Sequence, residues 1–348
     1  MKNLDISQIE IQNLITHSVG NKQREERLAL SHETTNVGDE TRKLLLKYFL
    51  QPLKDNEIFS FVHSVNISFN EVFALVRGIF REPRSFVSAS QSLAKLLYES
   101  STHPKIKSGE LNVAYFSDII FVDEIVDAVG IFKSETNVPF IKMERQSSKF
   151  KIEHDYGFEV KGIDKGCLIM NTSEEEGYRV LIFDGSSKGN EAQYWKDDFL
   201  MLEPVNDDYY QTDQFLGLTK SFITEGLPEE LAANKAGRID MLNRSVNYFK
   251  THESFDRDEF AGEVFEDDRV REVFRDYDSS YRTENGLDLS ESFEISPYAV
   301  RKQARVFKSI IKLDKNFHIY VHGAAENIEQ GTDADGRKYY KIYYENEL

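Results

Sequence analysis

The sequence predicts an α+β protein with two domains. A mixed N-terminal domain over residues 1–205 has a mainly antiparallel sheet with packed helices. A mainly helical C-terminal domain over residues 206–348 ends in a β-hairpin. Three observations support this. The 348-residue length is long for one core. Short alternating segments joined by polar turns precede Pro204, as in antiparallel sheets. Helical periodicity dominates from Gln211 onward.

The N-terminal domain is predicted to alternate early helices with a later run of strands. The helices are expected at 40–54, 70–81 and 83–100, where large apolar residues recur on one face. Partial alternation predicts strands, and these are expected at 6–16, 27–35 (polar, at a sheet edge), 110–117, 124–133, 149–152, 167–171 and 178–183.

In the C-terminal domain, helices are predicted at 211–225 and 228–252, with shorter helices as far as Arg275. Ser296 is a suitable N-cap and Pro297 suits the first helical position, so a further helix is expected to start there and run to Lys308, and to reach Lys312 if it persists. Two strands, 317–323 and 338–344, follow. Asp335-Gly336 is expected to form the turn between the last two strands, because Asp-Gly is a strong hairpin signal.

Charge is the most restrictive property of the composition. The formal net charge is -17, from 60 acidic and 43 basic residues. A protein this acidic is repelled by nucleic acid unless its cations gather on one surface. Cys167 is the single cysteine and lies in an apolar run, so it is expected to be a buried hydrophobe. No intrachain disulfide can form, and neither a signal peptide nor a membrane span is expected, so the predicted location is cytoplasmic.

The segment after Ser296 carries the largest local surplus of cations. At 100° per residue a continuous helix would place Arg301, Arg305, Lys308 and Lys312 on one stripe. This predicts a phosphate-contacting patch, to which Lys302, Arg337 and Lys338 also belong. The alternative is an ordinary surface helix whose cations pair with the acidic segment 253–294. A weaker basic candidate consists of Lys235, Arg238 and Arg244.

Motifs for catalysis or metal binding are few. The sequence has no phosphate-binding glycine loop, His-Glu-x-x-His or Cys-x-x-Cys motif. His318 and His322 are expected about 13 Å apart on one strand, too far to share a metal ion. Glu159-Val-Lys161 with Asp184 has a spacing found in magnesium-dependent nucleases, and the alternative is ordinary surface charge on strands. The acidic run 253–294 is either a solvated surface or a protein-contact surface.

Several stretches resemble the bacterial nucleoid-associated protein family of the NdpA type. They are Ile6-Ser-Gln-Ile-Glu-Ile-Gln-Asn-Leu-Ile, Asp127-Ala-Val-Gly-Ile-Phe-Lys-Ser-Glu, residues 215–223, Ile311-Lys-Leu-Asp-Lys-Asn-Phe-His-Ile-Tyr-Val-His-Gly and Asp335-Gly-Arg-Lys-Tyr-Tyr-Lys. The resemblance follows the expected order over nearly the whole chain. It implies a cytosolic protein of the bacterial nucleoid without a catalytic role, and it assigns no catalytic residue.

Three functional hypotheses follow. The first is a non-enzymatic nucleoid-associated protein that binds double-stranded DNA weakly, without strong sequence specificity, through the basic patch. The second is an acidic adaptor that binds a DNA-processing enzyme. The third is a magnesium-dependent nuclease built on Glu159, Lys161 and Asp184. No cofactor, metal or membrane partner is expected under the first hypothesis, and a homodimer is left open.

Overall fold

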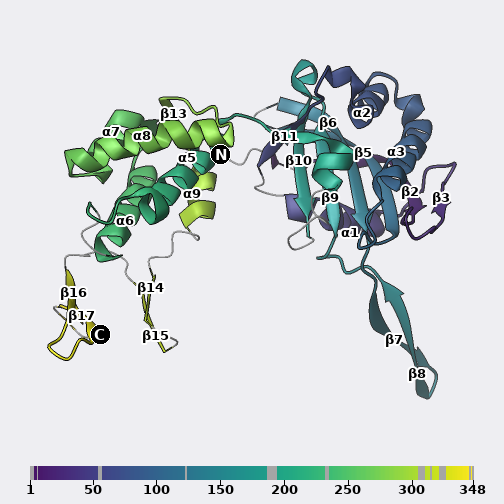
Figure 1. Cartoon of the computed structure of the whole chain (residues 1–348). Coiled ribbons are helices and arrows are strands. Elements are labelled where there is room, and N and C mark those ends of the chain that lie inside the picture. Colours follow the sequence, from purple (N-terminus) through teal and green to yellow (C-terminus); the bar gives the residue numbers. More distant parts are fainter. Residues whose placement is uncertain are drawn as a thin grey trace. The chain divides into compact units, whose positions relative to one another are not determined.

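The chain forms two compact units, Met1–Val205 (unit 1) and Asn206–Leu348 (unit 2). The computed structural model (Figure 1) describes residues 4–5, 7–53, 57–121, 124–185, 194–231, 235–304, 310–313, 316–320, 327–344 and 346. The hydrophobic clusters in the described residues each lie within one unit. The two units are therefore described separately.

Unit 1 is built on a nine-stranded sheet in which every recorded pairing is antiparallel, so the predicted antiparallel sheet is confirmed. In spatial order the strands are β11 (Leu202–Pro204), β4 (Ile58–Phe61), β10 (Arg179–Asp184), β9 (Lys165–Met170), β6 (Glu124–Ser134), β5 (Gly109–Phe121), β2 (Glu10–Val19) and β3 (Leu28–Ala29), with β1 (Leu4–Asp5) also paired to β5. The polar segment 27–35 lies at the edge as expected, but only Leu28–Ala29 is strand.

Helices cover both faces of this sheet, so its central strands are buried on both sides (Figure 1). The helices α2 (Glu71–Arg81) and α3 (Phe86–Ser100) pack on one face, where Ile131 and Cys167 point. The helix α1 (Asp39–Leu50) packs on the other face, where Phe132 and Leu168 point. Burial on both sides explains why residues 128–132 of β6 and 166–170 of β9 are all apolar. Cys167 is buried, as its apolar surroundings predict.

One aromatic ring fixes the packing of α1 on the sheet. The Phe132 ring on β6 stacks against the Phe49 ring of α1, with centroids 4.4 Å apart. Two glycines make room for it. A Cβ atom at Gly130 would lie 2.3 Å from the Phe132 ring, and one at Gly166 would lie 2.7 Å from it. Any larger residue at these two positions would push Phe132 out of its place.

A two-stranded ribbon extends from unit 1 outside the main sheet (Figure 1). It consists of β7 (Val138–Gln146) and β8 (Lys149–Gly157), which pair with each other from Val138–Gly157 to Gln146–Lys149. The sequence analysis predicted only a short strand near 149–152 and missed β7. The ribbon is wholly exposed between Pro139 and Tyr156.

Unit 2 is mainly helical, as predicted. Its helices are α5 (Asp208–Ser221), the π-helical turn η6 (Phe222–Gly226), α6 (Lys235–Thr251), α7 (Arg257–Val264), α8 (Asp268–Asn285) and α9 (Pro297–Ala304). Two short strands, β12 (Ser254–Asp256) and β13 (Ser292–Glu294), pair and bring the start of α7 close to the segment before α9. No described helix in the chain is long and apolar enough to cross a membrane.

Phenylalanine rings form the core of unit 2. Phe215 of α5 is fully buried, and its ring lies 4.3 Å from Phe255, 5.2 Å from Phe260 and 6.3 Å from Phe274, centroid to centroid. Aromatic pairs at these distances add to the free energy of area burial. Because these rings come from α5, β12, α7 and α8, this one cluster joins most of unit 2.

The C-terminal end departs from the prediction in two ways. The basic helix α9 is described as far as Ala304, residues 305–308 of the predicted helix lie outside the described residues, and Ile310–Leu313 form strand β14, so the helix does not persist to Lys312. The adjacent isoleucines Ile310 and Ile311 favour a strand. The strand pairing also differs, because β14 pairs with β15 (Phe317–Tyr320) and β16 (Ile328–Thr332) pairs with β17 (Lys338–Ile342). The Asp335-Gly336 turn joins β16 to β17, as predicted, and a C-terminal hairpin is confirmed.

We predict that residues 1–205 and 206–348 each fold when expressed alone, because each carries its own hydrophobic core. Each fragment should be soluble and should unfold in one cooperative transition by far-UV circular dichroism. A fragment that is unfolded alone would mean that the two units share essential contacts.

We predict that Phe215→Ala destabilises unit 2 by about 3–5 kcal/mol, because it leaves a cavity among the phenylalanine rings. The chain has one tryptophan, Trp195, which is buried in unit 1. Its fluorescence therefore reports unit 1 in the intact chain. The circular dichroism transition of unit 2 should move to lower urea while the tryptophan transition stays in place. A joint shift of both transitions would show that the units unfold together.

Candidate nucleic-acid interface

The exposed cations of α9 are held by the packing of the helix on unit 2. Its buried residues Ala299 and Val300 face the core, and the Ser296 carbonyl accepts the first helical hydrogen bond from the Val300 amide. The amide of Ser296 in turn donates to the Thr212 hydroxyl of α5, at 3.0 Å. With one side buried, the neighbouring positions Arg301 and Lys302 are exposed.

Two tyrosines hold these cations in place. The guanidinium of Arg301 lies 4.3 Å from the ring centre of Tyr298, within cation–π distance. The amine of Lys302 lies 5.2 Å from the ring centre of Tyr209 and donates to its hydroxyl at 2.7 Å. It also lies 3.8 Å from the carboxylate of Asp213. Within the described part of the chain no carboxylate is recorded in ion-pair contact with Arg301, so its charge is the more available of the two.

Arg337 and Lys338 are the residues of the predicted patch that lie in the hairpin of β16 and β17. The Arg337 guanidinium lies 3.3 Å from Asp333 and 3.2 Å from Asp335, both in the turn between β16 and β17. The Asp333 carboxylate also accepts from the amides of Asp335 and Arg337, which fixes the turn. The charge of Arg337 is therefore largely neutralised locally, whereas Lys338 is exposed at the start of β17.

The predicted cationic stripe is therefore not present as one helical stripe. The structure brings Arg301 and Lys302 together on α9. Lys312 lies on β14, and its backbone position is directly opposite that of His318 on β15. Arg305 and Lys308 lie outside the described residues. The backbone positions of the predicted cations are thus divided between α9 and β14, both in unit 2, and the side chain of Lys312 lies outside the described residues.

The second basic candidate is used inside unit 2. Arg238 donates to the carbonyl oxygens of Ile223 and Leu227, where the π-helical turn η6 ends. Arg244 pairs with Asp240 at 2.9 Å and with Glu266 at 2.9 Å. The side chain of Lys235 lies outside the described residues. Arg238 and Arg244 therefore stabilise the fold and do not form a free cationic face.

Six carboxylates of the acidic run 253–294 have recorded arginine partners within unit 2. Asp278 is buried and lies 2.5 Å from Arg257 and 2.7 Å from Arg282. Asp267, at the densest acidic point, caps α8 by accepting from the Arg269 amide at 2.9 Å, and the Arg269 side chain lowers the pKa of Asp267. The recorded carboxylate partner of Lys302 is on α5, so the alternative in which the basic helix pairs with this run is not what the described contacts show.

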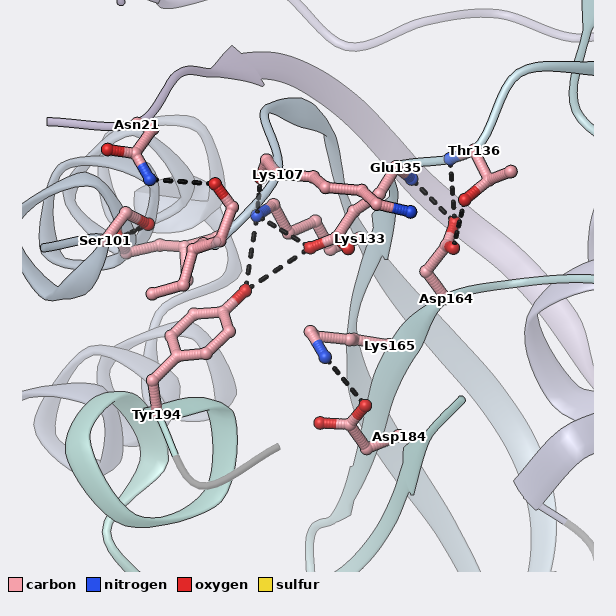
Figure 2. A network of polar contacts seen from close by, with 12 residues as sticks. Asn21, Ser101, Lys107, Lys133, Glu135, Thr136, Asp164, Lys165, Asp184 and Tyr194 are labelled. Carbon is pink, nitrogen blue, oxygen red and sulfur yellow. Dashed lines mark hydrogen bonds and ion pairs between the residues drawn. The ribbon is translucent and has the colours of Figure 1, made fainter. Parts of the chain in front are cut away.

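Two of the three nuclease candidate residues line a cavity of about 550 Å³ in unit 1, and Asp184 is not among its lining residues. Glu159 and Lys161 line it, together with Asp164, Lys165 and Tyr194. Asp184 accepts from Lys165 at 2.7 Å, as Figure 2 shows. Asp184 and Lys165 are paired residues on neighbouring strands β10 and β9. The Asp184 carboxylate is therefore committed at least in part to a buried lysine.

A buried polar network adjoins this cavity (Figure 2). The fully buried Lys133 amine lies 2.9 Å from Glu135 and donates to the Lys107 carbonyl at 2.6 Å and the Tyr194 hydroxyl at 3.2 Å. Burial lowers the pKa of Lys133, an effect that Glu135 opposes. Burial likewise raises the pKa of Tyr194. The two buried cations here, Lys133 and Lys165, each have a carboxylate partner, as buried charges require.

The same network fixes the base of the β7–β8 ribbon. The Asp164 carboxylate accepts from the amides of Glu135 and Thr136, at 2.7 Å and 3.1 Å, and from the Thr136 hydroxyl at 2.7 Å. Glu135 and Thr136 lead into β7, and Asp164 follows β8. These contacts tie the two ends of the ribbon together, which gives the network a structural role.

The potential metal ligands in the described residues lie elsewhere. Only His252, Glu259 and Glu263 form a group of three His, Cys, Asp or Glu side chains close enough to share an ion there. The Nε2 atom of His252 lies 3.5 Å from Glu263, and its Nδ1 atom lies 3.0 Å from the Tyr248 carbonyl. Both glutamates are exposed, and these contacts alone account for the cluster.

Comparison with known families identifies the class of protein. The family model described as nucleoid-associated protein YejK matches residues 15–336. The match spans both units and reaches from β2 to the β16–β17 turn. The chain belongs to this nucleoid-associated protein family. No curated protein matches the chain significantly.

We predict that Asp184→Ala lowers the free energy of unfolding of unit 1 by about 3 kcal/mol, because it takes a partner from the buried Lys165. Glu159→Ala should change stability by less than about 0.5 kcal/mol, because Glu159 is exposed. Urea titrations followed by Trp195 fluorescence measure both values.

We expect the wild-type protein not to cleave DNA, so neither variant should change DNA cleavage. Supercoiled plasmid incubated with each protein and Mg²⁺ should stay supercoiled. Nicking by wild type that is lost in Glu159→Ala, a variant expected to remain folded, would establish the nuclease hypothesis.

Proposed function

We propose that this chain is a non-enzymatic nucleoid-associated protein that contacts double-stranded DNA through the basic surface of unit 2 that starts at Arg301. One observation supports this most directly. In a chain of a nucleoid-associated family, α9 holds Arg301 and Lys302 exposed and supported by tyrosine rings. We include Lys312 on β14 and Lys338 on β17 in the candidate surface, together with Arg305 and Lys308, which lie between Lys302 and Lys312 in sequence.

The expected mode of recognition is contact with phosphates. Arginine and lysine side chains that meet phosphates position a protein on the duplex but carry no sequence information. Recognition should therefore be weakly sequence-specific. Local cations can act despite the net charge of -17, because charges farther than a Debye length, about 10 Å at 0.1 M salt, are largely screened.

The adaptor hypothesis has less support from the described contacts. An acidic surface that binds a basic enzyme needs carboxylates that are not already paired. Asp267, Asp268 and Asp278 all have arginine partners within unit 2. The adaptor remains the alternative if purified protein does not bind DNA.

We predict that a quadruple variant, Arg301→Gln, Arg305→Gln, Lys308→Gln and Lys312→Gln, has a shallower salt dependence of DNA affinity. If all four cations contact phosphates, the slope of log affinity against log salt should fall by about 3 to 4. The measurement is a titration of labelled duplex at several salt concentrations.

The matched control removes four exposed cations from unit 1, by Lys43→Gln, Lys47→Gln, Arg84→Gln and Lys95→Gln. It changes the net charge by the same amount and should leave the slope close to that of wild type. Equal slopes for the quadruple variant and wild type, with both folded, would move the DNA contact elsewhere. No binding by wild type at low salt would favour the adaptor.

A further inference from the structure

The β7–β8 ribbon has one apolar face that is open to solvent. Directly opposite residues in an antiparallel pair share a face, and successive residues alternate. The pairs Ile141–His154, Met143–Ile152 and Pro139–Tyr156 therefore lie on one face, with Arg145–Phe150 toward the tip. The five large apolar side chains of this face keep 62–67% of their surface exposed, and they are Ile141, Met143, Phe150, Ile152 and Tyr156.

The opposite face of the ribbon carries the charges. Lys142 lies opposite Glu153, and Glu144 lies opposite Lys151. The Lys151 amine also pairs with Glu153 along the strand, at 2.7 Å. Opposite charges in directly facing positions stabilise strand pairing. The ribbon is thus amphipathic, and its charges are balanced on the face away from the apolar one.

The apolar face has the size of a functional surface patch. If each of the five side chains exposes on the order of 100 Å², the face presents roughly 500 Å² per copy, which matches the largest apolar patches of monomers, and patches of that size are often functional. Two such faces packed together would bury about 1,000 Å², which reaches the range of specific interfaces. The face therefore calls for a partner with a matching apolar surface.

We propose that two copies of this chain pack the apolar faces of their β7–β8 ribbons together in a two-fold arrangement. A two-fold interface requires one self-complementary patch, and an apolar strand-pair face can pack on its own copy. Charge supports the same partner. Copies with a net charge of -17 repel each other, but the ribbon 138–157 carries four cations and three anions and is close to neutral.

Duplex DNA fits this face less well than a second copy does. Phosphates require cations, and the face offers only Arg145 and His154 among its apolar side chains. The ribbon also extends beyond the main sheet of unit 1 (Figure 1), so two ribbons can meet without contact between the two main sheets. This inference is independent of the DNA proposal, which concerns unit 2.

The test uses the double variant Met143→Lys with Ile152→Glu in the full chain. These residues are directly opposite, so the new pair preserves strand pairing and net charge but interrupts the apolar face. Sedimentation equilibrium should give a dimer for wild type and a monomer for the variant, with the dissociation constant raised at least about tenfold. Circular dichroism and Trp195 fluorescence check that the variant is folded.

The control is Lys142→Gln with Glu153→Gln, a directly opposite pair on the charged face. It also preserves net charge and should leave the dimer intact. A second readout is hydrogen exchange of residues 139–156, which should slow as wild-type concentration rises. The proposal is overturned if wild type is a monomer at all concentrations, or if the double variant dimerises as wild type does. If the double variant keeps the molecular mass of wild type but binds duplex DNA more weakly, the ribbon would instead be a DNA-contacting arm.

Discussion

The excess of negative charge is the constraint on which the rest of this structure depends. Sixty acidic residues must be accommodated by forty-three basic ones. In unit 2 most of the arginines are used for this purpose, since Arg257 and Arg282 flank the buried Asp278 and Arg244 holds Glu266. Removing Arg257 or Arg282 would take a partner from the buried Asp278 carboxylate, which is destabilising. Few cations therefore remain for a nucleic acid, and those that remain on α9 are local.

The same constraint shapes unit 1. Two lysines, Lys133 and Lys165, are buried beside the sheet, and each has a carboxylate partner. The Asp164 carboxylate that completes this region holds the base of the β7–β8 ribbon. The polar contacts of the ribbon are thus at its base, its paired charges are on one face, and its other face is apolar.

Helices and strands with a clear local pattern of apolar residues could be predicted from the sequence. The alternation in 110–133 and the apolar face of 70–81 predicted strands and a helix that the structure contains, with Asn70 capping α2 through the Phe73 amide. The sequence analysis missed β7, although Ile141 and Met143 alternate with Lys142 and Glu144, because an exposed apolar ribbon looks like neither a buried strand nor a loop.

The basic segment shows the opposite failure. Helical spacing placed Arg301 and Lys312 on one stripe, but the isoleucines Ile310 and Ile311 favour a strand, and β14 forms there. The predicted cations therefore lie on a helix and on a strand, so the single helical stripe is wrong. Partners distant in sequence, such as Tyr209 and Asp213 for Lys302, could not be predicted, because the packing of α9 on α5 brings them together.

Hydrogen exchange of the full chain, with and without a short duplex at low salt, tests most directly whether unit 2 carries the DNA contact. The account predicts that duplex slows amide exchange in peptides covering residues 297–313 and 336–341. Exchange in the sheet of unit 1 should stay unchanged. Slower exchange confined to unit 1, with no change after Arg301, would contradict it.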